Sequence, residues 1–204
     1  MNNSNFPDIN IFGFNTTTCD APWPAWIFFT KECNLNCPYC HNKEAMYNQP
    51  AIISNIVENK LIEINNNPLI KGIIISGGEP TIQNNLIDFL RRAKTSFPRL
   101  KVKLDTNGTR PMVVSNIIRE KLVDFIAMDI KMPFGRYEEL RRDKRENFYQ
   151  ELGNLAFISS QLIKRSKIEH EFRITVDPDL VSHKELKQIS NMFKCIKIQK
   201  VVKR

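Results

Sequence analysis

The stretch GIIISGGEP, from Gly72 to Pro80, joins an isoleucine-rich run directly to a glycine-rich turn. β-Branched residues favour a strand, and paired glycines let the backbone come close to a ligand or to another segment. Pro80 fixes the direction in which the chain leaves the turn. A strand that ends in such a turn is typical of α/β sheets, in which ligands collect at the carboxyl ends of the strands.

Similar apolar, β-branched or aromatic runs recur on both sides of this stretch, with amphipathic helical patterns between them. The predicted strands cover Ala25 to Phe29, Gly72 to Ser76, Lys101 to Asp105, Phe125 to Asp129, Phe172 to Val176 and Lys197 to Val202. The predicted helices cover Ile53 to Ile64, Leu86 to Ser96, Met112 to Leu122, Phe148 to Lys164 and Lys184 to Phe193. This alternation predicts an α/β fold with parallel strands and right-handed crossovers. Six strand–helix units fall short of a closed eight-stranded barrel, which leaves an open partial barrel or a doubly wound sheet.

The length of the chain and of its apolar stretches narrows the class of protein. The chain has 204 residues, enough for a single domain with its own core. No apolar stretch approaches the roughly 20 residues of a membrane span, and the N-terminus lacks a signal-peptide pattern. We therefore expect a cytoplasmic protein with no membrane partner.

The net charge of +8 raises the question of a nucleic-acid partner. The basic residues are interleaved with acidic or apolar ones, at Arg136 to Arg145, Lys164 to Lys167 and Lys194 to Arg204. That pattern favours a solvated basic surface over a nucleic-acid groove. The charge could also serve to dock an acidic protein or an anionic electron donor.

Three of the five cysteines lie in the segment CNLNCPYC, at Cys33, Cys37 and Cys40. This odd count and tight spacing disfavour a secreted disulfide framework and favour a metal or redox site. Soft sulfur ligands select zinc or iron–sulfur clusters. Zinc would require a fourth ligand such as His41, whereas three thiolates on a [4Fe-4S] cluster leave one iron free to bind a substrate or cofactor. Cys19 and Cys195 are interpreted as a loop thiol and a small core residue.

Polar or glycine-rich clusters follow four successive predicted strands. They are Cys33 to Cys40, Gly77 to Pro80, Asp105 to Gly108, and Asp129 to Lys131. Because the carboxyl ends of parallel strands share one rim, the four clusters are expected to converge on a single site.

The motifs CNLNCPYCHN (33–42), SGGEPT (76–81), LDTNG (104–108) and AMDIK (127–131) resemble the radical S-adenosylmethionine (SAM) superfamily, and within it the glycyl-radical-enzyme activases. The nearest types are the activating proteins of anaerobic ribonucleoside-triphosphate reductase and pyruvate formate-lyase. The resemblance implies a single-domain partial (β/α)6 TIM-like barrel over residues 25–204, preceded by an N-terminal hairpin over residues 1–24. Lys31 and Glu32 stand where the family more usually has a glycine.

The same resemblance assigns candidate site residues. A [4Fe-4S] cluster would be held by Cys33, Cys37 and Cys40, which makes these the catalytic cysteines. SAM would be bound by Tyr39, Gly77, Gly78, Glu79, Pro80, Asp105, Asn107, Asp129, Lys131 and Arg173, although Arg173 could equally be a solvent-facing strand residue. Glu79 would meet the amino group of SAM and Lys131 its carboxylate. A monovalent cation would be bound by the carboxylates of Asp105 and Asp129, an oxygen of Thr106 and the main-chain carbonyl of Met128.

The implied reaction is reductive cleavage of SAM, followed by hydrogen abstraction from a glycine of a partner enzyme, most nearly anaerobic ribonucleoside-triphosphate reductase. A flavodoxin- or ferredoxin-type protein would supply the electron. Only Cys19 and Cys195 remain as further cysteines, which disfavours relatives with auxiliary clusters. Two alternatives remain at this point: a radical SAM enzyme acting on a small molecule or modified nucleoside, and a zinc-bearing binding module. No role follows for His41, His170 or His183.

Overall fold

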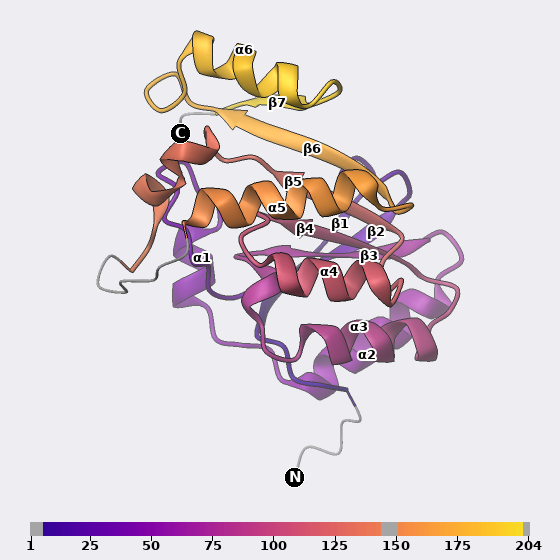
Figure 1. The fold of residues 1–204 in the computed structure, drawn as a ribbon. Helices are drawn as coiled ribbons and strands as arrows, with labels where there is room; N and C mark the ends of the chain where they lie inside the picture. The colour runs from indigo at the N-terminus through magenta and orange to yellow at the C-terminus, as the bar shows by residue number, and fades with distance from the viewer. Residues whose placement is uncertain (1–5, 144–150, 202–204) are drawn as a thin grey trace.

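The computed structural model describes residues 6–143 and 151–201, which form one seven-stranded sheet with helices on its outer side (Figure 1). The strands are β1 (Ile11–Thr17), β2 (Ala25–Thr30), β3 (Gly72–Gly77), β4 (Lys101–Thr106), β5 (Phe125–Asp129), β6 (Glu169–Val176) and β7 (Lys197–Lys200).

The strand order identifies the architecture. The strands lie in the sheet in chain order, from β1 to β7. β1 pairs antiparallel with β2, and the pairs from β2 to β7 are parallel. A doubly wound sheet reverses its strand order at a switch point, and this sheet does not. The chain is therefore a single α/β domain with an open, partial TIM-like barrel.

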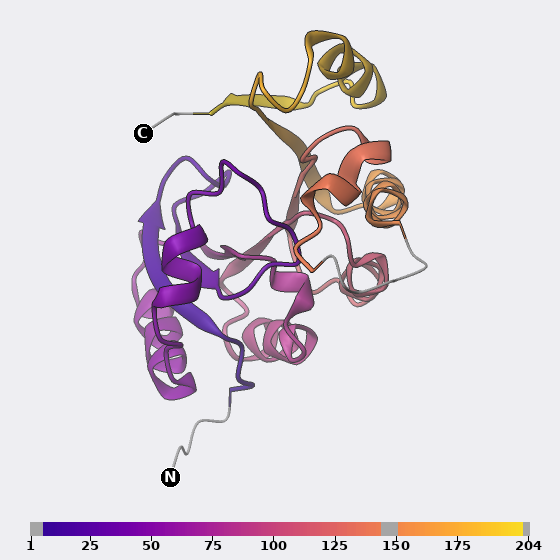
Figure 2. The ribbon, with the colours of Figure 1, turned by 90° about the vertical axis from the view of Figure 1, so that its left-hand side faces the viewer.

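The helices follow one another around the outside of the curved sheet. The helical segments are α1 (Lys43–Asn48), α2 (Ser54–Asn66), α3 (Leu86–Ser96), α4 (Pro111–Arg119), α5 (Leu152–Arg165), α6 (His183–Met192) and the 3₁₀ segments η1 (Pro80–Ile82) and η2 (Phe134–Leu140). Figure 2 shows α2 to α5 in an arc outside the strands.

Two apolar clusters lie on opposite faces of the sheet. The larger cluster lies between the sheet and the helices and includes Ile75, Leu104 and Phe89. The smaller cluster, on the inner face, consists of Trp23, Ala25, Ile27, Ile74, Phe125 and Ala127. Side chains alternate between the two faces along each strand, so the residues that follow Ala127 at every second position also belong to the inner face.

The predicted elements match the structure at most positions. The helix at Leu86–Ser96 and the strand at Phe125–Asp129 are confirmed at both ends. β6 begins three residues earlier than predicted, at Glu169. Residues 148–150 of one predicted helix and Val202 of the last predicted strand lie outside the described residues. The sequence reasoning did not predict α1 and η2, and both flank the site described below.

Among residues 6–143 and 151–201, no helix is long and apolar enough to cross a membrane.

Candidate active site

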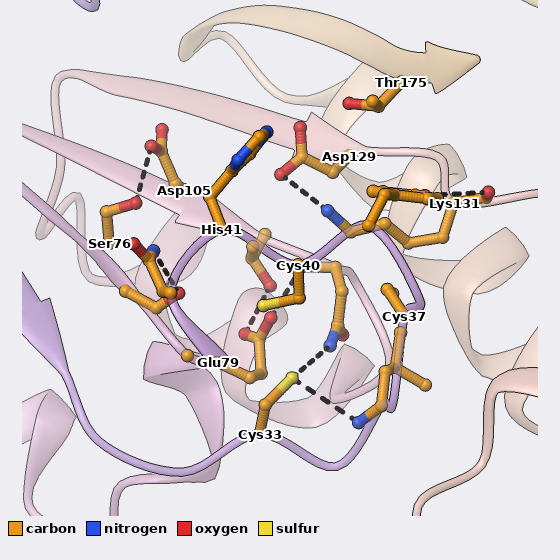
Figure 3. A pocket seen from close by; sticks show the side chains of 17 residues that line it. Cys33, Cys37, Cys40, His41, Ser76, Glu79, Asp105, Asp129, Lys131 and Thr175 are labelled. Atoms are coloured by element: carbon orange, nitrogen blue, oxygen red, sulfur yellow. Dashed lines mark hydrogen bonds and ion pairs between the residues drawn. The ribbon is translucent and has the colours of Figure 1, made fainter. Parts of the chain in front are cut away.

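An open pocket lies at the carboxyl ends of the parallel strands, with about 840 Å³ of empty space, part of it open to solvent. Most of the residues singled out from the sequence line it. They are Cys33, Cys37, Tyr39, Cys40, Gly77, Gly78, Glu79, Asp105, Thr106, Asn107, Asp129 and Lys131. Figure 3 shows the thiols of Cys33 and Cys40 beside Glu79, with Asp129 and Lys131 across the pocket. The four clusters therefore converge, as their positions after the strands predicted.

The cysteine loop, residues 33–40, is held at its middle by the segment η2. The amide of Asn36 donates to the carbonyl of Leu140 at 2.7 Å, and the amide of Arg142 donates to the carbonyl of Asn34 at 3.2 Å. The loop then closes on itself through a 3.2 Å bond from the Cys40 amide to the Cys37 carbonyl. These backbone bonds hold the loop in place, because residues 33–40 form no helix or strand of their own.

The turn after β3 requires both of its glycines. Gly77 has a φ of +109°, a conformation that side chains disfavour. A Cβ on Gly78 would lie 1.7 Å from the carbonyl oxygen of Glu32, at the entry to the cysteine loop. This close approach allows two 2.8 Å bonds, from the Gly78 amide to the Thr30 carbonyl and from the Glu79 amide to the Glu32 carbonyl. The turn and the cysteine loop are thus joined main chain to main chain.

Glu32 itself adopts a left-handed backbone conformation, with a φ of +62°. Its side chain is exposed, so packing does not explain the choice of residue. A glycine would adopt this φ without steric cost, and the resembled family more usually has a glycine in the place of Lys31 and Glu32. This chain therefore differs from the family in the residue type before Cys33, while Glu32 keeps a backbone conformation that favours glycine.

Glu79 is 1% exposed, and both of its carboxylate oxygens accept hydrogen bonds. Oε1 accepts from the amide of Thr81 at 3.1 Å and from the hydroxyl of Thr106 at 2.7 Å, and Oε2 accepts from the amide of Asn107 at 2.6 Å. Burial raises the pKa of the carboxyl, while these donors oppose the rise. Glu79 therefore ties the turn after β3 to the turn after β4.

Asn107 extends this connection to the cysteine loop. Its side-chain nitrogen donates to Oδ1 of Asn34 at 3.0 Å and lies 3.9 Å from the sulfur of Cys33. The amide of Leu35 donates to the same sulfur at 3.4 Å. Hydrogen bonds to a cysteine sulfur stabilise its thiolate form and tune any iron bound to it.

The far wall of the pocket carries an ion pair. Nζ of Lys131 lies 3.2 Å from Oδ2 of Asp129, and Arg173 contacts the other oxygen of Asp129 through Nε at 2.8 Å. Burial alone would raise the pKa of Asp129, but Lys131 and Arg173 outweigh it and hold that pKa at about 2. The main chain of Lys131 is fixed by the hydroxyls of Tyr39 and Tyr137, which bond to its carbonyl and its amide at 3.3 and 3.0 Å.

Three predicted site residues do not line the pocket: Pro80, Met128 and Arg173. Pro80 is buried at the start of η1, and Met128 belongs to the apolar cluster on the helix side of the sheet. Arg173 is an inward residue, since its side chain is 11% exposed and reaches the aspartates from behind the pocket wall. The solvent-facing alternative for Arg173 is therefore wrong.

Comparison with known proteins assigns the family. The family model of the radical SAM superfamily matches residues 27–183, about three quarters of the chain. The chain belongs to the radical SAM superfamily. Its relatives include a protein of Methanocaldococcus jannaschii provisionally named a glycyl-radical enzyme activating enzyme, 34% identical over 87% of this chain and 72% of the relative. A probable GTP 3′,8-cyclase of Pyrococcus horikoshii is 30% identical over 51% of this chain and 33% of that relative.

Solved structures agree on the fold of this radical SAM chain. Native anSMEcpe with bound AdoMet superposes with a TM-score of 0.65 at 17% identity, over 84% of this chain and 49% of that one. SuiB of Streptococcus suis bound to S-adenosylmethionine gives a TM-score of 0.61 at 13% identity, over 87% and 40% of the two chains. The radical SAM chain thus spans half or less of the length of these structures.

A [4Fe-4S] cluster and SAM are the groups that radical SAM membership implies, and the donor set in the pocket fits the cluster. The three thiols line one pocket and are soft ligands. Among the described residues, no three His, Cys, Asp or Glu side chains are grouped to hold a single metal ion. A cubane cluster takes each thiolate on a different iron, so its ligands need not meet at one point. Burial, followed by the charge of Glu79, raises the pKa of Cys33 to about 12.

The remaining cysteines and histidines lie outside the pocket, apart from His41. Cys195 is exposed, so its interpretation as a small core residue is wrong; α6 and β7 leave it at the surface. Cys19 is an exposed loop thiol, as expected. His41 is an exposed residue on the pocket rim, His183 begins α6, and His170 packs edge-on against Phe172.

The sequence did not point to four residues that support the pocket: Asn34, Ser76, Lys103 and Tyr137. Ser76 donates to Oδ2 of Asp105 at 2.9 Å, and the ammonium of Lys103 lies 3.1 Å from Oδ1 of the same aspartate. Ser76 directly precedes the GGEP motif, so its position was a usable signal. Asn34 lies inside the cysteine segment, whereas nothing local marks Tyr137.

Substituting Gly78 with alanine should displace the cysteine loop, because the new Cβ would occupy the space of the Glu32 carbonyl. Overpacking of this kind costs about 1–3 kcal/mol of unfolding free energy. Urea denaturation measures the loss. Gly135→Ala is the matched control, since its Cβ would meet nothing within 4 Å. Equal stability of the two variants would contradict the close approach.

Replacing Glu32 with glycine should preserve or raise stability. A left-handed backbone costs a non-glycine residue about 1–2 kcal/mol, and the greater freedom of an unfolded glycine offsets about 0.5–1 kcal/mol of that gain. Thermal unfolding measures the net change. Glu32→Ala removes the same carboxylate but keeps the Cβ, so it should not share the gain; a matching gain would point to charge instead of backbone strain.

Proposed function

We propose that this radical SAM enzyme is a glycyl-radical-enzyme activase, which cleaves SAM reductively and takes a hydrogen atom from a glycine of a partner protein. The observation that carries the proposal is the 34% identity, over 87% of this chain, to the provisionally named activating enzyme of Methanocaldococcus jannaschii. A second relative with the same kind of name is 26% identical over 80% of the chain. We propose anaerobic ribonucleoside-triphosphate reductase as the partner, on the motif resemblance alone.

The chemistry belongs to the bound groups: one electron and SAM yield methionine, and the adenosyl carbon takes the glycine hydrogen to give 5′-deoxyadenosine and a glycyl radical. Cys33, Cys37 and Cys40 would hold three irons and leave the fourth open. A flavodoxin- or ferredoxin-type protein is proposed as the source of the electron. The basic character of the chain, with a net charge of +8, suits an acidic donor.

The pocket walls divide the work of binding SAM. We propose that the turn from Gly77 to Pro80 receives the amino group, because its backbone is fixed beside the cysteine loop. Lys131, with Asp129, would receive the carboxylate, since its ammonium faces the pocket and its main chain is fixed by two tyrosine hydroxyls. Asn107, Asp105, Tyr39 and Arg173 would complete the surroundings of the cofactor. Glu79 acts in the same region by holding two turns together.

The remaining cysteines support an activase over enzymes with auxiliary clusters. Cys19 and Cys195 are both exposed, and neither lines the pocket. An auxiliary [4Fe-4S] cluster is commonly held by four cysteines, and the chain offers only these two beyond the loop.

A second function is a radical SAM enzyme that acts on a small molecule or nucleotide. It is favoured by the 30% identity to the probable GTP 3′,8-cyclase over 51% of the chain. In the assay below, formation of 5′-deoxyadenosine that depends on a nucleotide, with no radical on a partner protein, would select this function.

The decisive experiment uses protein purified and reconstituted without oxygen. With dithionite, SAM and anaerobic ribonucleoside-triphosphate reductase, we expect one 5′-deoxyadenosine for each glycyl radical, counted by chromatography and by the EPR doublet. Failure to form a glycyl radical on any glycyl-radical enzyme tested would reject the activase function. Binding of one zinc per chain in place of iron would reject the radical SAM chemistry as well.

Cys37→Ala should abolish cluster binding, because it removes one of the three thiols that line the pocket. Iron and sulfide per chain, with the visible absorption of the reconstituted protein, measure the loss. Cys195→Ala removes an exposed thiol outside the pocket and should retain the full iron content. A cluster that survives in Cys37→Ala and fails in Cys195→Ala would reverse the assignment.

A further inference from the structure

A layer of charged side chains lies on the inner face of the sheet, behind the pocket. It consists of Lys103, Asp105, Asp129, Glu171 and Arg173, joined by Lys131 at the pocket wall. In β5, Asp129 follows Phe125 and Ala127 at alternate positions on the face that carries the inner apolar cluster. The ammonium of Lys103 lies 5.6 Å from the centre of the Phe125 ring, which places Lys103 on the same face.

Asp105 is surrounded by groups of this chain. Its Oδ2 accepts from the hydroxyl of Ser76 at 2.9 Å. Its Oδ1 has the ammonium of Lys103 at 3.1 Å and a guanidinium nitrogen of Arg173 at 3.4 Å. Neither of these two contacts is aligned as a hydrogen bond, so the attraction on Oδ1 is electrostatic.

Asp129 is neutralised in the same way from two sides. Arg173 donates from Nε to Oδ1 at 2.8 Å, and Lys131 donates from Nζ to Oδ2 at 3.2 Å. One guanidinium therefore contacts the carboxylates of both Asp105 and Asp129 and supplies positive charge between them.

Lys103 is the least expected member of the layer, because its side chain is not exposed at all. Besides Asp105 it faces Glu171, with 3.7 Å between Nζ and Oε1, and it donates to the carbonyl of Asp20. A buried ammonium is tolerated only when it is paired and hydrogen-bonded, and each of these groups contributes to that.

The charges in the layer already balance. Asp105, Asp129 and Glu171 carry three negative charges, and Lys103, Lys131 and Arg173 carry three positive ones. Lys197, with 63% of its side chain exposed, adds a further ammonium 2.8 Å from Oε2 of Glu171. An added metal cation would therefore bring excess positive charge to a largely buried group whose carboxylates are already fully balanced, which is unfavourable at low dielectric.

The hydroxyl of Thr106 is also engaged, since it donates to Glu79. Met128 was expected to contribute its main-chain carbonyl, and its side chain lies in the apolar cluster on the helix side. The two carboxylates are thus already paired with cations of this chain, and the Thr106 hydroxyl is bonded to Glu79, so these side chains do not fit an added monovalent cation.

We propose that Lys103 and Arg173 supply, in this chain, the positive charge that the resembled activases take from a monovalent cation, so that SAM binding is independent of K⁺ and Na⁺. The inference rests on the proposed function only in assuming that SAM binds in this pocket. Lys103 is then a positioning residue, which acts on the cofactor through Asp105 and Arg173.

The first test uses the reconstituted wild-type protein. SAM affinity by equilibrium dialysis, and the melting temperature without SAM, are compared in KCl, NaCl and N-methylglucamine chloride at equal ionic strength. We expect both quantities to be the same in the three salts. A higher melting temperature and tighter SAM binding in KCl or NaCl than in the organic salt would overturn the inference, because a ligand that binds the native state raises its stability.

The second test uses Lys103→Met, which keeps the length of the side chain and removes the charge. This variant should bind SAM about tenfold more weakly in N-methylglucamine chloride and recover in KCl, since the cation and SAM then become coupled ligands. Lys197→Met removes an exposed charge from the edge of the same layer and should remain salt-independent. A folded Lys103→Met variant that stays salt-independent would remove Lys103 from the proposal.

The outcomes also separate this inference from the proposed function. If Lys103→Met does not fold, the wild-type comparison still decides. If the wild-type protein binds no SAM in any salt, the proposed function fails, while its melting temperatures in the three salts still test whether the aspartates hold a cation.

Discussion

Two backbone hydrogen bonds connect the parts of the site, and most of its geometry depends on them. The amides of Gly78 and Glu79 donate to the carbonyls of Thr30 and Glu32, each at 2.8 Å. Both donors and both acceptors are main-chain groups, so the bonds do not depend on the type of side chain. They require only that no side-chain atom lies between the two segments. This requirement selects glycine at position 78, because any Cβ there would collide with the Glu32 carbonyl. The cysteine loop can take its position beside the turn only because that space is empty.

A side-chain connection continues this main-chain one. Glu79 accepts hydrogen bonds from the turn after β4, and Asn107 of that turn contacts both Asn34 and the sulfur of Cys33. A buried carboxylate is costly to desolvate, and the donors around it offset that cost. Because the carboxylate needs all of these donors, movement of one turn would disturb the other and the cysteine loop with it.

Local pattern sufficed to predict the elements that bury one face. The helix Leu86–Ser96 has Leu86, Phe89, Leu90 and Ala93 at helical spacing, and these are its buried residues. The 3₁₀ segment η2 is too short for such a pattern to stand out: Phe134, Tyr137 and Leu140 recur every three residues, and Phe134 packs against Phe157 of α5. The predicted helix Phe148–Lys164 ends within one residue of the observed end at Arg165, because the buried Ile163 continues the apolar pattern into the last turn.

The site was predictable where chemistry marks it and not where geometry does. Cysteines, glycines and aspartates after strands have few other uses, so their convergence followed from the parallel sheet. Lys103 escaped notice because Lys101, Lys103 and the apolar Val102 and Leu104 alternate like a strand with one face in water. Here that face is the interior of an open barrel. The positive φ of Glu32 likewise could not be predicted, because nothing in the local sequence marks a left-handed conformation at this residue.

The order of the strands has a consequence for how the chain reaches this state. Each strand pairs with the one that precedes it in the sequence, so the sheet can grow during synthesis by adding one strand and helix at a time. Asp105 and Asp129 are then made before Arg173, their shared partner. Until β6 joins the sheet, the two carboxylates lack the guanidinium that contacts both of them, and exposure to water is then more favourable for them than burial. Docking of β6 is therefore the step at which the inner charged layer closes, and the nascent barrel acquires its final electrostatics only after its first four parallel strands are in place.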